Sequence, residues 1–185
     1  MSGRREEAAP DPALRERHAA IYAAGWLAPF EHWRVAPRIL AGRNPLSELD
    51  VVELATLGVT HLLDLREERE WTSLHVPGTD AVEALPRHGI ERRHVPIPDF
   101  SAPLPADFAA ASAFLDAVFA RGDTTLYAHC RVGIQRTPTI LAAWIAKRDG
   151  LTVLEAARSL RLHGYPGWPL PEQMEAAVRW VEGGG

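Results

Sequence analysis

The stretch from residue 129 to 137 reads His-Cys-Arg-Val-Gly-Ile-Gln-Arg-Thr, and it decides how the rest of the chain is interpreted. It contains Cys130, the only cysteine among 185 residues, and Arg136 follows six positions later. A strand-like run at 124–128 precedes the stretch, and a largely apolar helical run at 138–147 follows it. Because unpaired backbone N–H groups converge where a loop enters a helix, this arrangement predicts an anion-binding loop.

Composition narrows the class of protein. With 46% hydrophobic and 24% charged residues, the chain is typical of one globular domain with a buried core. A net charge of −4 argues against a nucleic-acid partner. One cysteine excludes an internal disulfide framework and any multi-cysteine metal site, so we expect no metal and no cofactor. No apolar run approaches the roughly 20 residues of a membrane span, and none resembles a signal peptide. We therefore expect a cytoplasmic protein; its oligomeric state stays open.

The order of elements predicts an α/β domain. Residues 1–12 are expected to be a disordered lead, and 13–185 a single catalytic domain. Strands are predicted at 38–43, 59–65, 90–97 and 124–128, with helices at 13–27, 45–57, 104–121, 138–147, 152–162 and 171–181. Residues 74–89 are predicted to be mainly loop. Strands that alternate with helices predict a central, mostly parallel sheet flanked by helices.

A charged run follows the second predicted strand, at 66–70. We interpret it as solvated surface; the alternative is that Arg66 or Glu67 braces the loop around Cys130.

The spacing within the loop explains its chemistry. Five residues separate the cysteine from the arginine, which lets backbone N–H groups surround a tetrahedral dianion while the Arg136 guanidinium closes the ring. Amide dipoles and a guanidinium also favour the nucleophilic thiolate of Cys130. The candidate substrate-binding residues are Arg131, Val132, Gly133, Ile134, Gln135 and Arg136.

The residues at the ends of the loop have candidate roles of their own. The Thr137 hydroxyl can donate to the Cys130 sulfur, or it can cap the next helix with Pro138 at the first position, and these roles compete. We expect His129 to hydrogen-bond backbone groups and hold the loop in shape, rather than to transfer protons.

The motif His-Cys-x5-Arg-Thr resembles the phosphate-binding loop of cysteine-dependent protein tyrosine and dual-specificity phosphatases. The resemblance extends from about Arg38 to Val181, because 58–66 and 152–161 are similar to a sheet strand and a helix of that family. It implies a protein tyrosine phosphatase-like fold. Nothing resembles the tyrosine-clamping loop of the large tyrosine-specific members, which favours a small, dual-specificity type. Gln135 departs from the family pattern, which often has glycine or serine there.

The resemblance also implies a proton donor. The family takes an aspartic acid from a loop some thirty residues upstream, and Asp99, in the sequence Pro-Ile-Pro-Asp, is similar in placement. By this resemblance Cys130 attacks phosphorus, Asp99 acts as general acid and then as base, and Arg136 stabilises the transition state. Gln173 resembles a water-positioning glutamine, although we prefer to interpret it as a polar residue on a helix surface.

Other functions remain open at this point. The main alternative enzyme is a rhodanese-like sulfurtransferase, which also presents one loop cysteine in an α/β domain. A phosphoinositide or inositol phosphate phosphatase and a non-catalytic phosphoprotein-binding module are further alternatives. The expected substrate is a phosphorylated protein or a small phosphomonoester, with phosphotyrosine favoured over phosphoserine or phosphothreonine.

Overall fold

The computed structural model describes residues 11–24, 29–72 and 79–183. The predicted disordered lead falls almost wholly outside these residues, and Pro12 already belongs to a helix. The strands are β1 (His32–Ala36), β2 (Ile39–Gly42), β3 (His61–Asp64), β4 (Glu91–His94) and β5 (Leu126–His129). The helices are α1 (Pro12–Ala24), α2 (Glu48–Thr56), α3 (Arg69–Thr72), α4 (Thr79–Ala84), α5 (Pro105–Phe119), α6 (Arg136–Asp149), α7 (Val153–Leu160) and α8 (Pro171–Glu182), with short 3-10 turns η1 (Leu85–His88) and η2 (Arg161–His163).

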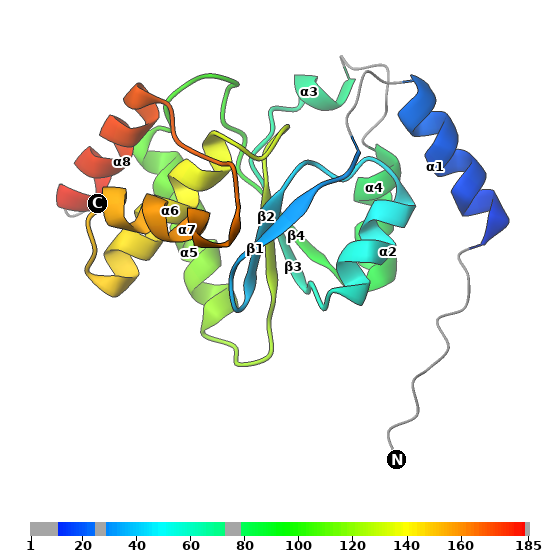
Figure 1. The fold of residues 1–185 in the computed structure, drawn as a ribbon, viewed down its shortest axis with the longest axis horizontal. Helices are drawn as coiled ribbons and strands as arrows, with labels where there is room; N and C mark the ends of the chain where they lie inside the picture. The colour runs from blue at the N-terminus through cyan, green and yellow to red at the C-terminus, as the bar shows by residue number, and fades with distance from the viewer. Residues whose placement is uncertain (1–10, 25–28, 73–78, 184–185) are drawn as a thin grey trace.

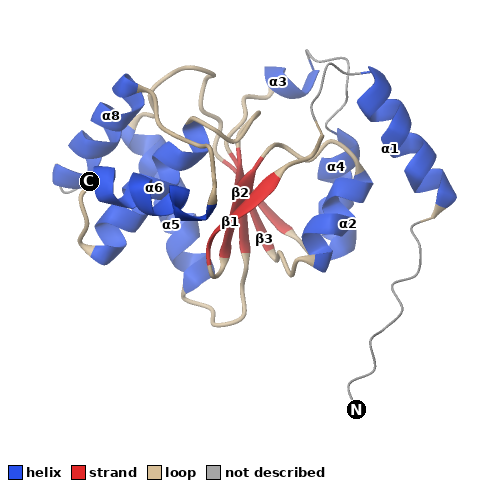
Figure 2. Cartoon of the chain, viewed as in Figure 1, coloured by secondary structure: helices blue, strands red, loops and turns tan. Residues whose placement is uncertain are grey.

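The strands form one twisted sheet in the order β1-β2-β5-β3-β4 (Figures 1 and 2). Only β1 runs antiparallel to its neighbour, so the predicted mostly parallel α/β fold is confirmed. The register aligns Gly42 with His129, His129 with Asp64, and Asp64 with His94. These residues end four adjacent strands, and in open α/β sheets ligands bind at that carboxyl edge.

Helices cover both faces of the sheet. Figure 1 shows α5 to α8 on one side of the sheet and α1, α2 and α4 on the other. Side chains along β5 alternate between two cores: Leu126 and Ala128 face the first and Tyr127 faces the second. In α6 every residue from 136 to 146 is buried, because the helix is enclosed by the sheet, α5, α7 and α8. The loop before α6 is therefore joined to the most deeply buried helix of the fold.

Local signals confirm several predicted boundaries. Ser47 caps α2, where its side chain accepts from Asp50 N. Thr152 and Glu155 form the predicted capping box of α7. Pro171 stands in the first turn of α8, as expected.

Two parts of the prediction were wrong or incomplete. Residues 79–88, predicted as loop, form α4 and η1 and bury Ala81, Ala84 and Leu85. Helices this short show no clear 3.6-residue period, so the pattern could not reveal them. Strand β1 was not predicted; it is an edge strand with only Val35 fully buried. Within the described residues, no helix combines the length and the apolar character required to cross a membrane.

Candidate active site

The loop at 130–135 joins the end of β5 to the start of α6, and Cys130 lies at its base. The cysteine is only 3% exposed, and Gly133 N donates to its sulfur across 3.2 Å. Gly133 has φ +80°, and a Cβ at this position would collide with the Gly42 carbonyl of β2. Glycine is therefore required here both by its backbone conformation and by its close contact with β2.

Four carbonyl groups of the loop accept hydrogen bonds, one from His129 at the end of β5 and three from donors on other segments. The pairs are Cys130 O with His129 Nδ1 at 3.0 Å, Arg131 O with Asn44 N at 3.3 Å, Gly133 O with the Tyr165 hydroxyl, and Ile134 O with Trp168 N at 2.8 Å. In a planar trans peptide the C=O of one residue and the N–H of the next point in opposite directions. Carbonyls fixed outward therefore turn the following N–H groups toward the space above the sulfur.

Tyr165 and Trp168 belong to the segment between η2 and α8. Burial raises the pKa of Tyr165 well above its usual range, so the phenol keeps its proton and remains a donor. Gly167 leaves no room for a Cβ, because the Tyr165 ring lies against it. Sequence reasoning missed both residues, since this segment shows only the Gly, Pro and aromatic composition of a loop.

A buried ion network supports the loop from the β3 side. Asp64 is fully buried, and its carboxylate accepts from Arg66 at 3.0 and 3.1 Å and from Arg92 at 3.1 and 3.2 Å. Burial acts to raise the pKa of Asp64, but nearby His129, Arg66 and Arg92 outweigh it and hold that pKa well below its usual range. Arg66 in turn lies 3.0 Å from the side-chain oxygen of Asn44, whose amide nitrogen donates to Arg131 O. The network thus links β3 to the loop.

His129 is fully buried and is neutral at neutral pH. Burial lowers its pKa to about 4, although the Asp64 carboxylate opposes this shift. The neutral ring donates from Nδ1 to Cys130 O, the kind of backbone contact that the sequence predicted.

Arg136 is 1% exposed, and its guanidinium is paired with two carboxylates. Glu70 binds it in bidentate fashion at 2.6 and 2.8 Å, and Asp99 Oδ1 lies 2.9 Å from Nη2. Burial acts to lower the pKa of Arg136, but hydrogen bonds to Glu70 and the negative charges around the guanidinium raise it above its usual value. Nε has no hydrogen-bond partner among the described residues.

The charged run at 66–70 is only partly solvated surface, so the preferred interpretation was wrong at two of its positions. Arg66 is 2% exposed and Glu70 7% exposed, and both are part of the site. Sequence reasoning did not identify Glu70, because its partner Arg136 is 66 positions away along the chain.

Asp99 stands in a tight turn over residues 98–101. Ser101 N donates to Pro98 O at 3.1 Å, and Asp99 N donates to Glu67 Oε2 at 3.1 Å. The structure therefore brings Asp99, Arg136 and the Cys130 loop together, as the sequence predicted.

Two other candidates lie in places that differ from those expected. Helix α6 begins at Arg136, so Pro138 is not its first residue, and of the two roles considered for Thr137 the helix cap was wrong. The Thr137 hydroxyl is buried and makes no hydrogen bond to any described residue, so its donation to sulfur stays a prediction. Gln173 is fully buried, so the helix-surface interpretation was also wrong.

Comparison with known proteins identifies the family. A family model described as "Polymorphic toxin system, DSP-PTPase phosphatase" matches residues 42–150. Dual specificity protein phosphatase 26 of Bos taurus is 31% identical over 114 residues, which are 60% of this chain and 49% of that protein. The chain thus spans about half the length of the curated relatives it matches.

Solved structures share the fold. Tk-PTP in its active form superposes with a TM-score of 0.70 at 24% identity and covers 82% of this chain and 96% of its own. PTPMT1 superposes with a TM-score of 0.71 at 20% identity and covers 83% of this chain and 95% of its own. The chain belongs to the dual-specificity phosphatases within the cysteine-dependent protein tyrosine phosphatase superfamily.

Proposed function

We propose that the protein hydrolyses phosphate monoesters through a thiophosphate intermediate on Cys130. The observation that carries the proposal is the set of hydrogen bonds that hold the carbonyls of residues 130, 131, 133 and 134; with these carbonyls held, we expect the loop N–H groups to face the sulfur, as Gly133 N does. Such a ring of donors complements the equatorial oxygens of a phosphoryl group in transfer.

The reaction has two steps. In the first, the Cys130 thiolate attacks phosphorus, an S–P bond forms, and the P–O bond breaks while Asp99 gives its proton to the leaving oxygen. In the second, the Asp99 carboxylate takes a proton from water, the water oxygen attacks phosphorus, and the S–P bond breaks. Inorganic phosphate and the thiolate are the products.

Arg136 and Thr137 support these steps. The Nε of Arg136 is a buried donor without a partner among the described residues, so it can bind a phosphoryl oxygen while Glu70 holds the rest of the guanidinium. Thr137 has a buried hydroxyl that bonds to none of the described residues, and it can donate to the sulfur as it leaves phosphorus.

We propose phosphotyrosine as the preferred substrate, with phosphoserine and phosphothreonine as further candidates and the cytoplasm as the compartment. Half-buried Arg131 places one cation at the mouth of the loop, and Ile134 is 37% exposed beside it. Because PTPMT1 has a solved structure in complex with PI(5)P, a phosphoinositide belongs in the substrate panel.

The test is hydrolysis of p-nitrophenyl phosphate in the presence of a metal chelator. We expect the parent protein to be active and Cys130→Ser to be inactive; full activity of the variant would remove the mechanism. Phosphotyrosine peptide, phosphothreonine peptide and an inositol phospholipid are then compared side by side. Transfer of sulfur from thiosulfate to cyanide by the same preparation would instead support the sulfurtransferase.

The general acid is tested with leaving groups of different basicity. Asp99→Ala is expected to lower kcat/KM far more for a phosphotyrosine peptide than for p-nitrophenyl phosphate, because kcat/KM reports the first step, in which the more basic tyrosyl oxygen needs a proton to leave. Equal losses would show that Asp99 is not the acid.

A further inference from the structure

The turn that carries Asp99 has a strained backbone. Phe100 has φ +60°, the only positive φ of a non-glycine residue in the described part of the chain. It occupies the third position of the turn closed by Ser101 N and Pro98 O, where a positive φ normally selects glycine or asparagine. A bulky residue in this conformation is strained and persists only where surrounding contacts hold it.

Side chains from three other segments hold this turn. Glu67 accepts from Asp99 N, and Arg136 pairs with the Asp99 carboxylate and donates to Ile97 O at 2.9 Å. These contacts fix the turn up to Asp99. Beyond Phe100, the Ser101 carbonyl accepts from Gln173 Nε2 at 3.0 Å.

Gln173 is well placed to act as an anchor because both the oxygen and the nitrogen of its side-chain amide make hydrogen bonds. Its oxygen accepts from Leu170 N at 3.1 Å and lies 3.2 Å from the Thr139 hydroxyl of α6. Its nitrogen donates to Ser101 O. One fully buried side chain therefore joins three parts of the chain: the start of α8, helix α6, and the turn that carries Asp99.

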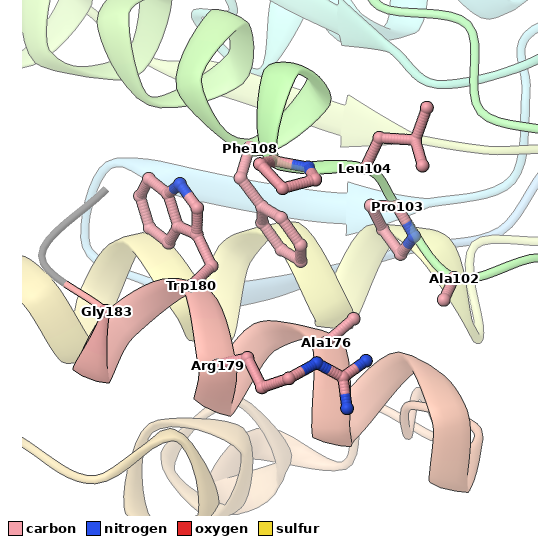
Figure 3. Close-up of a pocket in the computed structure, with 9 residues that line it drawn as sticks. Ala102, Pro103, Leu104, Phe108, Ala176, Arg179, Trp180 and Gly183 are labelled. Atoms are coloured by element: carbon pink, nitrogen blue, oxygen red, sulfur yellow. The ribbon is translucent and has the colours of Figure 1, made fainter.

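Helix α8 packs against α5, whereas the chain after the turn is only partly packed: Pro103 is buried, but Ala102 is half-buried and Leu104 is 65% exposed. Trp180 of α8 stacks on Phe108 of α5 with ring centroids 5.2 Å apart (Figure 3). Between α8 and residues 102–105, however, there is a cavity of about 470 Å³, so packing does not fill the space beside that segment. The hydrogen bond from Gln173 reaches Ser101, which directly precedes the residues that line this cavity.

We propose that Gln173 is a positioning residue that keeps the strained turn in the conformation aiming the Asp99 carboxyl at the phosphoryl site. The inference rests on the proposed function and extends it. It also differs from the water-positioning role that the sequence resemblance implies for Gln173, since the amide is turned to Ser101 O, Leu170 N and Thr139.

The test compares Gln173→Met, which keeps the length of the side chain but removes the amide, with the parent and with Asp99→Ala. For Gln173→Met we expect kcat/KM, which reports the step in which the leaving group departs, to fall on the order of tenfold to a hundredfold with a phosphotyrosine peptide and much less with p-nitrophenyl phosphate. The quantity compared between variants is the ratio of kcat/KM for the phosphotyrosine peptide to kcat/KM for p-nitrophenyl phosphate. This ratio does not depend on the fraction of protein that is folded. Val153→Ala, a core change in α7, is the control for general destabilisation and should leave the ratio unchanged.

A double variant, Gln173→Met with Asp99→Ala, tests whether the two residues act together. Because Gln173 is inferred to act through Asp99, the double variant should show no larger change in the ratio than Asp99→Ala alone. An unchanged ratio in Gln173→Met, or additive changes in the double variant, would overturn the inference while the proposed function stands.

Burst kinetics separate the two roles of Gln173. If Gln173→Met accumulated phosphorylated enzyme with an unchanged ratio, Gln173 would act on water in the second step and the anchor would be wrong. If Asp99→Ala itself left the ratio unchanged, Asp99 would not be the general acid, and the inference about Gln173 would be refuted with it.

Discussion

The ion pair between Glu70 and Arg136 yields the sharpest prediction about the site. Replacing Glu70 by glutamine keeps the shape of the side chain but removes its charge, and it turns an NH₂ group toward the guanidinium donors. Arg136, which is 1% exposed, would then keep Asp99 as its only carboxylate partner among the described residues. Removing one member of a buried pair costs about 3–5 kcal/mol, and we expect the lower end, about 3 kcal/mol, because Asp99 remains.

Thermal unfolding converts this cost into a measurable shift. For a domain of this size, 1 kcal/mol corresponds to about 2–4 °C in Tm, so Glu70→Gln should melt about 6–12 °C below the parent. Because the guanidinium loses its bidentate support, kcat/KM for p-nitrophenyl phosphate should also fall on the order of tenfold to a hundredfold.

Glu68→Gln provides the matched control, since Glu68 is exposed on the same segment and the substitution is identical. It should change Tm by about 2 °C or less, as expected for a surface position. If Glu70→Gln had the same Tm and the same kcat/KM as the parent, the assignment of Glu70 as the support of Arg136 would be refuted.

Two more predictions concern the loop and its base. Tyr165→Phe removes only the hydroxyl that holds Gly133 O, so kcat should fall about tenfold with little change in KM. Tyr22→Phe is the control: it removes a hydroxyl bonded to Asp50 and should not affect kcat. Steady-state kinetics with p-nitrophenyl phosphate checks this, and equal kcat values for both variants would contradict it. Stability should fall as the pH drops from 6.5 toward 4, because unfolded His129 takes up a proton at its ordinary pKa of 6.5 while folded His129, with a pKa of about 4, does not. The loss should reach about 3 kcal/mol in urea unfolding, and a His129→Asn variant with the same pH dependence would show that His129 is not its source.

The sequence predicted the parts of the site that lie in local patterns. The loop at 129–137 carries its own spacing, and Asp99 stands in a turn marked by prolines. The parallel sheet followed from the alternation of strands and helices.

The residues it missed or misplaced act on partners far away in the chain. Tyr165, which was not identified, is 32 positions from Gly133, and Gln173, which was placed on a helix surface, is 72 positions from Ser101. No periodicity or composition signals such a contact, because only the fold brings the two segments together. The charged run was misread for a related reason: Glu70 pairs with Arg136, and Arg66 bonds to Asp64 and lies beside Asn44, so these charges are buried with polar partners that only the fold assembles.

The most direct test of the mechanism is to trap the phosphoryl group on Cys130. Asp99→Ala mixed with p-nitrophenyl phosphate should form the thiophosphate readily, because nitrophenolate leaves without a proton, but should hydrolyse it slowly because the base is missing. Rapid denaturation, digestion and mass spectrometry would then locate the phosphoryl group. We predict phosphorylation of the peptide containing Cys130 and none in Cys130→Ser. Release of nitrophenol without phosphorylated Cys130, or phosphorylation of another side chain, would contradict the mechanism.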